Sequence, residues 1–186
     1  GSSVPALDHV SFTIEEGAFV LLCGKTGSGK TTLLHMLKKE MTPHGILHGR
    51  RLYKGKEISG LDSRLSASQI GYIMQDPDSQ LVCDSVSREL AYGLENLGTP
   101  SDRIRRIVAE TASLLGLSEI FHARTDQLSG GQKQLVALGA VLAMGAQVLL
   151  LDEPCSMLDP LAAAEFLAVL ERLNREAGIT VILTDH

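Results

Sequence analysis

One stretch of eight residues constrains this chain more than any other feature: Gly24-Lys25-Thr26-Gly27-Ser28-Gly29-Lys30-Thr31. It matches the pattern G-x-x-x-x-G-K-[ST] at every fixed position. The apolar run 19–23 before it is typical of a buried strand, and leucines on one helical face at 31–39 predict a helix after it. The sequence therefore predicts a strand, a phosphate-binding loop and a helix, in that order.

Each residue type in this loop has a chemical reason. Glycines let the backbone turn tightly and point its N–H groups at phosphate oxygens, and the helix start adds the positive end of its dipole. Lys30 offers a charge to the β- and γ-phosphates, and Thr31 offers a hydroxyl to Mg²⁺. The residues that we expect to bind a nucleotide here are Gly24, Lys25, Thr26, Gly27, Ser28, Gly29, Lys30, Thr31 and Thr32. Alone, the motif would equally suit a kinase or a GTPase.

A second motif carries two carboxylates at the end of a hydrophobic strand. The run 148–151 is followed by Asp152 and Glu153. Because side chains alternate faces along a strand, the two carboxylates have different roles. Asp152 suits the shell of a Mg²⁺ ion, and Glu153 can act as general base for the attacking water. The adjacent glutamate favours hydrolysis over transfer of the phosphoryl group to another substrate.

Strands and helices alternate along most of the chain, which predicts an α/β fold with a mainly parallel sheet. The block 84–144 is helical throughout and interrupts that alternation, so we interpret it as an inserted helical subdomain. The nucleotide-binding core is then 1–83 and 145–186 of one domain, 1–186. The elements expected in the core are strands at 9–14, 19–23, 70–74, 148–151 and 180–183, two short antiparallel edge strands within 48–58, and helices at 31–39 and 161–176.

Composition excludes several classes of protein. The net charge of -5 argues against a protein that coats nucleic acid, so no nucleic-acid partner is expected. No apolar run approaches the ~18 residues that a membrane helix needs, so any link to a membrane must come through a partner. Cys23, Cys83 and Cys155 have no metal-ligand spacing, and so sparse a set fits reduced thiols.

A second anion-binding motif stands before the helix that starts near residue 133. Leu128-Ser129-Gly130-Gly131-Gln132 combines a hydroxyl, two glycines and a helix N-terminus. One active site has no need for two phosphate cradles. Two copies docked head to tail do need them, because each copy's second cradle closes on the nucleotide that the other copy holds.

At this point the sequence resembles the ABC (ATP-binding-cassette) ATPase family over nearly its whole length. Leu128–Gln132 matches the family signature, Gln75 resembles the glutamine of the Q-loop, and 156–159 resembles the D-loop. His186 resembles the histidine that contacts the γ-phosphate in the family. The motifs stand in the family's order, and their spacings fit. The resemblance implies a RecA-like P-loop NTPase core.

The resemblance also implies roles for residues of this chain. Catalysis would rest on Glu153, His186, Lys30 and Gln75, and Mg²⁺ would be held by Thr31, Gln75 and Asp152. Besides the phosphate loop, ATP would meet the Ser129, Gly130, Gly131 and Gln132 of a second ABC domain, which is another copy, a paralogue or part of the same chain. The region around Gln75 would contact a transmembrane subunit, which places the protein on the cytoplasmic face of a membrane.

The finer resemblance is to energy-coupling-factor and cobalt-type ATPases, whose importers take up vitamins or transition-metal ions. It rests on the segments 72–81 and 89–96. The alternative that stays open is a soluble ABC-type switch that acts on ribosomes or DNA, although the compact block between Gln75 and Ser129 favours a transporter.

Some features depart from the family pattern. Leu135 stands where the family usually has arginine, Cys155 replaces threonine or serine, and Asp185 precedes His186 where threonine is commoner. No aromatic residue precedes Phe12, although the family stacks adenine on one. Together with a core strand close to the last residue, this predicts a chain truncated at both ends.

Overall fold

The computed structural model describes residues 5–185. Its strands are β1 (Phe19–Cys23), β2 (Leu52–Tyr53), β3 (Lys56–Glu57), β4 (Ile70–Ile73), β5 (Val148–Leu151) and β6 (Thr180–Asp185). Its α-helices are α1 (Lys30–Met36), α2 (Ser63–Gln69), α3 (Val86–Asn96), α4 (Ser101–Leu114), α5 (Gly130–Ala143) and α6 (Pro160–Ala177). Among these described residues no helix is both long enough and apolar enough to cross a membrane.

A parallel sheet with the strand order β1-β6-β5-β4 forms the centre of the described chain. Strands β4 and β5 are apolar over their whole length because helices cover both faces of the sheet. Since the strands are parallel, their carboxyl ends meet at one edge, where ligands bind in open α/β sheets. The predicted α/β P-loop fold is confirmed.

Strand alternation divides the core into two layers. On one face, Leu149, Leu151 and Leu183 pack against α5 and α6. On the other, Leu150 and Ile182 belong to one cluster with Leu34 of α1 and with Ile58 and Leu61, which precede α2. Every second residue therefore belongs to the same face, and this period of two also decides which polar side chains meet beyond the strand ends.

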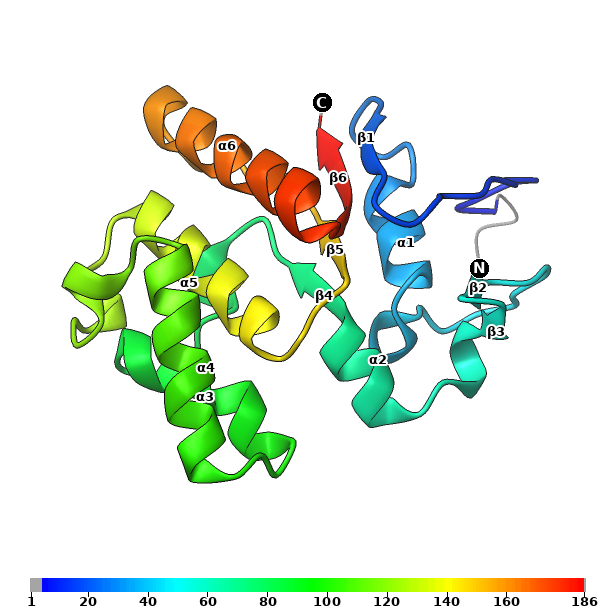
Figure 1. Ribbon diagram of the computed structural model, residues 1–186. Helices are drawn as coiled ribbons and strands as arrows, with labels where there is room; N and C mark the ends of the chain where they lie inside the picture. The colour runs from blue at the N-terminus through cyan, green and yellow to red at the C-terminus, as the bar shows by residue number, and fades with distance from the viewer. Residues whose placement is uncertain (1–4, 186) are drawn as a thin grey trace.

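Helices α3, α4 and α5 gather on one side of the molecule, away from β1 and the β2–β3 ribbon (Figure 1). Buried Val86, Leu90, Val108, Val136 and Leu138 join them into the same hydrophobic cluster as the sheet. All three lie within 84–144, as expected from the helical spacing. The division of the chain into core and subdomain stays a prediction.

Most of the expected elements are present, including the two short antiparallel strands around the turn at Lys54-Gly55. The strand predicted from the alternation of Val10, Phe12 and Ile14 is wrong: residues 9–14 form no strand. Within the described residues the segment pairs with no strand, and Val10 and Phe12 remain 52% and 47% exposed, whereas Ile14 packs against the cluster around Leu34. Helix α2, which the sequence reasoning missed, starts where the Asp62 carboxylate accepts hydrogen bonds from the backbone of Arg64 and Leu65.

Candidate nucleotide-binding and catalytic site

The loop between β1 and α1 lines an open pocket of about 480 Å³. Gly29, at the start of α1, has φ 92° and ψ 8°, a left-handed conformation that favours glycine. A Cβ at this position would lie 2.8 Å from the carbonyl oxygen of Ala6, so glycine is also required for space. Within the described chain no side chain caps α1, which leaves the N–H groups of its first turn available to an anion.

Lys30 is folded back over the loop. Its ammonium donates hydrogen bonds to the carbonyl oxygens of Gly24 at 2.5 Å and Lys25 at 3.5 Å, and lies 3.8 Å from Oε1 of Glu153. The side chains of Lys30 and Glu153 are only 9% and 15% exposed. A buried positive charge therefore already stands at the loop where the sequence predicts phosphates.

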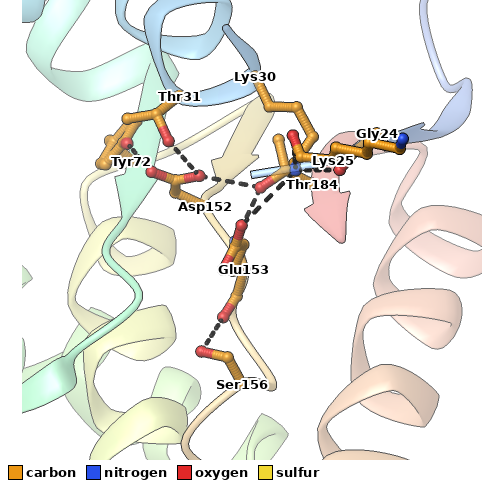
Figure 2. Close-up of polar contacts among 9 residues, drawn as sticks. All are labelled: Gly24, Lys25, Lys30, Thr31, Tyr72, Asp152, Glu153, Ser156 and Thr184. Atoms are coloured by element: carbon orange, nitrogen blue, oxygen red, sulfur yellow. Dashed lines mark hydrogen bonds and ion pairs between the residues drawn. The ribbon is translucent and has the colours of Figure 1, made fainter. Parts of the chain in front are cut away.

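Asp152 is surrounded by hydroxyl groups from three elements (Figure 2). Thr31 of α1 donates to Oδ1 at 3.1 Å, Thr184 of β6 donates to Oδ1 at 2.9 Å, and Tyr72 of β4 donates to Oδ2 at 3.2 Å. Tyr72 and Thr184 belong to the alternation of Ile70 and Ile182, the face that α1 covers. The sequence reasoning gave neither a place in the site, because Tyr72 entered it only as part of the segment 72–81 and no motif contains Thr184.

Glu153 follows Asp152 at a sharp turn of the backbone. Its φ is 46°, a left-handed value that is uncommon outside glycine, asparagine and aspartate. Hydrogen bonds on both sides hold the turn. The Glu153 N–H donates to the Thr184 hydroxyl at 2.9 Å, and the Glu153 carbonyl accepts from the Ser156 hydroxyl at 2.9 Å and from the Ser156 backbone N–H at 3.1 Å. This turn brings the Glu153 side chain to the pocket lining.

The hydroxyl of Tyr72 is held in its neutral form. Burial, and then the nearby charge of Asp152, raise the pKa of Tyr72 above the ordinary value of a tyrosine. A neutral hydroxyl donates a hydrogen bond to a carboxylate, whereas a phenolate would repel it. The contact between Tyr72 and Asp152 therefore persists at physiological pH.

The signature motif lies at the start of α5, and its end is closed by its own side chains. The Ser129 hydroxyl accepts from the Gln132 backbone at 3.2 Å, and the Gln132 side-chain oxygen accepts from the Ser129 backbone at 2.9 Å, a reciprocal capping box. Ser129 and Gly130 are exposed. None of the residues 129–132 belongs to the lining of the pocket at the phosphate loop.

Gln75 is exposed at the edge of that pocket, and the segment around it is tied to α5. The Lys133 ammonium lies 2.5 Å from Oδ1 of Asp78, and the amide of the fully buried Gln134 donates to the Met74 carbonyl at 3.4 Å. The segment is therefore linked directly to the helix that carries the signature motif.

The structure brings most, but not all, of the expected site residues together. The lining of the pocket consists of Ala6, Thr26, Gly27, Ser28, Gly29, Lys30, Thr31, Thr32, Gln75 and Glu153. Asp152 contacts this set through Thr31. His186 lies outside the described residues. Over residues 5–185 no cluster of three histidines, cysteines or acidic residues could hold a metal ion.

Comparisons of the sequence with known proteins identify relatives that are described as ATP-binding proteins. Residues 7–156 match the family described as ABC transporter. A putative ABC transporter ATP-binding protein of Bacillus cereus is 50% identical over 97% of this chain, which covers 33% of that protein. An energy-coupling factor transporter ATP-binding protein of Symbiobacterium thermophilum is 43% identical over 97% of this chain and 62% of its own length. The chain thus spans about a third of the first of these relatives.

Solved structures give the same result. CbiO1 from Clostridium perfringens, described as part of the ABC transporter complex cbiONQ, superimposes with a TM-score of 0.86 at 35% identity, over 97% of this chain and 72% of that one. A dimeric ATP-binding cassette bound to ADP and phosphate superimposes with a TM-score of 0.81 at 26% identity, over 97% and 80%. The chain carrying this phosphate loop and this pair of carboxylates belongs to the ABC transporter family, as an ATP-binding domain.

Proposed function

We propose that this chain binds ATP with Mg²⁺ and hydrolyses it to drive a membrane importer. The observation that supports this most strongly is the meeting of the three chemical parts of one reaction at one pocket. The phosphate loop lines the pocket, Asp152 accepts a hydrogen bond from Thr31, and the Glu153 carboxylate lies 3.8 Å from the Lys30 ammonium. A protein that only bound a nucleotide would not need a carboxylate at that third position.

Binding starts at the open end of α1. The N–H groups of its first turn and the loop before it take the phosphates, and the Lys30 ammonium leaves its carbonyl partners to neutralise the outer phosphates. A phosphate is a better partner for the buried Lys30 ammonium than a carbonyl oxygen, because a hydrogen bond between two charged groups is the stronger one.

The residues present fit a Mg²⁺ ion. Thr31 and Asp152 offer a hydroxyl and a carboxylate, the hard oxygen ligands that Mg²⁺ prefers, and Gln75 can add an amide oxygen. When bound, the ion supplies positive charge beside the phosphates. Tyr72 and Thr184 hold the Asp152 carboxylate in place from below, so that it need not reorganise when the ion arrives.

Hydrolysis needs a base for the attacking water. Glu153 is suited to that role because the left-handed turn brings its carboxylate to the pocket lining, 3.8 Å from the Lys30 ammonium. His186 would contact the γ-phosphate, as the resemblance implies. In this proposal it stabilises charge alongside Lys30.

A second cassette completes the site. Ser129 and Gly130 are exposed on this chain and do not reach its own pocket, so they are free to meet a nucleotide that another cassette holds. A related cassette bound to ADP and phosphate is dimeric. We infer a head-to-tail dimer that closes on two ATP molecules and opens after hydrolysis.

A transmembrane subunit would receive this motion at the Gln75 segment. The segment touches the pocket through Gln75 and the signature helix through Asp78 and Met74, so closure of either side moves it. The similar proteins named above belong to an energy-coupling factor transporter and to the complex cbiONQ. We therefore propose that this chain lies at the cytoplasmic face of a membrane and powers the uptake of a vitamin or a metal ion.

The test uses the full-length protein that contains this chain. Glu153→Gln removes the base but keeps the shape, so phosphate release falls by roughly 100-fold while ATP binding stays. Glu165→Gln, on the exposed side of α6, is the matched control and keeps the wild-type rate. Light scattering follows the dimer, which persists with trapped ATP in Glu153→Gln. Equal phosphate release by Glu153→Gln and the wild type would sink the proposal.

A further inference from the structure

Thr184 stands at the centre of the site and belongs to no motif. It lies in β6, between β1 and β5, and is fully buried. Figure 2 shows its hydroxyl between Asp152 and Glu153. Its Oγ1 is 2.9 Å from Oδ1 of Asp152 and 2.9 Å from the backbone nitrogen of Glu153.

The chemistry of these two partners determines the direction of both hydrogen bonds. A backbone N–H can only donate, so the Thr184 oxygen accepts from Glu153. An ionised carboxylate can only accept, so the single proton of Thr184 goes to Asp152. One hydroxyl therefore connects the two carboxylate residues, and neither bond can be replaced by an apolar side chain of the same shape.

The bond to Glu153 holds a turn that the backbone does not adopt readily. Strand β5 ends at Leu151, so the ladder to β6 no longer determines the position of Glu153. Its φ of 46° lies in the left-handed region, which is unfavourable for an L-residue. Such conformations persist where the surroundings hold them, and Thr184 supplies the hydrogen bond from the sheet that does so.

We propose that Thr184 is a positioning residue for hydrolysis, which aims the Glu153 carboxylate and fixes the Asp152 carboxylate through one buried hydroxyl. This rests on the proposed function, because it assigns the geometry of the same hydrolytic site. Thr184 is not itself among the residues that line the pocket at the phosphate loop, so it acts through Asp152 and Glu153. Its loss should lower kcat and leave the binding of ATP without Mg²⁺ almost unchanged.

The chain offers a matched control in the same strand. Thr180 is also buried in β6, on the same face, and its hydroxyl accepts a backbone N–H, from Gly17 at 2.9 Å. It lies at the amino end of β6, away from the site. Thr180→Val and Thr184→Val therefore remove a hydroxyl of equal burial with an isosteric side chain, and both should lower the urea midpoint to a similar extent.

The experiment measures phosphate release, nucleotide affinity and urea midpoints for the full-length protein and its variants. Thr184→Val should lower kcat at least about tenfold, because the base is misplaced, with KM for ATP changed less than about twofold. Thr184→Ser should restore most of kcat, and Thr180→Val should keep it. If Thr184→Val does not fold, Thr184→Ala against Thr184→Ser isolates the hydroxyl between two side chains of nearly equal size.

The outcomes separate this inference from the proposed function. One outcome overturns the positioning role and leaves hydrolysis standing. In it, Glu153→Gln abolishes turnover, but kcat of Thr184→Val stays within about twofold of the wild type and kcat of Thr184→Ala within about twofold of Thr184→Ser. The same holds if kcat follows stability alone, with Thr180→Val losing as much as Thr184→Val. If Glu153→Gln hydrolyses at the wild-type rate, both proposals fall together.

Discussion

The chain contains two helix starts that are rich in glycine, and the structure treats them in opposite ways. Helix α1 begins after Gly29 with no side-chain cap within the described chain, so its first N–H groups await a partner. Helix α5 begins after Ser129 with a complete capping box, so the N–H groups of Ser129 and Gln132 already have partners in the same motif.

The difference teaches which of the two is a standing binding site. An uncapped helix end is unfavourable until an anion satisfies it, so α1 gains from ATP on every encounter. A capped end gains only if the anion offers more than Ser129 and Gln132 already give. We therefore expect α1 to bind ATP in a single cassette, and α5 to engage a nucleotide only when a second cassette presents it.

The largest effect expected from this contrast follows loss of charge at α1. Lys30→Met removes the buried ammonium beside the loop, and ATP affinity should fall about 100-fold because a charged hydrogen bond to phosphate is lost. Titration with a fluorescent ATP analogue measures it. Lys56→Met, on the exposed β3 strand, is the control. Unchanged affinity in Lys30→Met would contradict the role given to α1.

A smaller effect is expected from a change at α5, and it concerns the stability of the fold and not the affinity for ATP. Ser129→Ala removes an N-cap and should lower the free energy of unfolding by about 1 kcal/mol, with ATP affinity of the single cassette unchanged. Ser85→Ala is a sharp comparison, because Ser85 occupies the N-cap of α3 without a side-chain cap bond in the described structure. Urea denaturation measures both. A tenfold loss of ATP affinity in Ser129→Ala would show that α5 acts in the single cassette.

The smallest effect concerns Tyr72, which supports the α1 site from beneath. Its pKa is raised in the folded chain, first by burial and then by Asp152. The folded state therefore keeps the proton that the unfolded chain loses near pH ~10. This contribution to stability is complete below about pH 10 and is lost as the pH rises beyond it.

Urea midpoints between neutral and alkaline pH check this expectation. Tyr72→Phe should lower stability by about 0.5 kcal/mol at neutral pH and flatten the alkaline decline. Tyr92→Phe is the control, since Tyr92 is 46% exposed. An alkaline decline that is identical in Tyr72→Phe and the wild type would assign the decline to other groups.

The sequence predicted those elements well whose form depends on contiguous residues, and it predicted poorly those features that depend on pairing between distant segments. Strand β1 agrees with its predicted bounds, because the apolar run and the glycines after it are contiguous. Helix α1 ends at Met36, earlier than the 39 predicted, since the apolar period continues into the short turn that follows. The segment 9–14 has a strand's alternation but pairs with no strand among residues 5–185, and a local pattern does not show whether a partner strand exists.

The same reason explains the parts of the site that were missed. Tyr72 and Thr184 meet Asp152 only because Ile73 and Leu183 both pair with Leu151, which puts the residues on either side onto one face. Register between distant strands is a tertiary property. The residues named by motifs keep to their expected segments, but which of them share a pocket, and that 129–132 do not, depended on the folded chain.

The pairing of β1 with β6 has a consequence for biosynthesis. The phosphate loop follows β1, and the neighbouring strand β6 is about 160 residues later in the sequence, with Phe19 opposite Val181. A ribosome thus releases the loop long before the partner of β1 exists, and closing so distant a contact is slow. We therefore expect the growing polypeptide to bind ATP only after β6 has been made, and bound ATP would then favour the finished fold over partly folded ones.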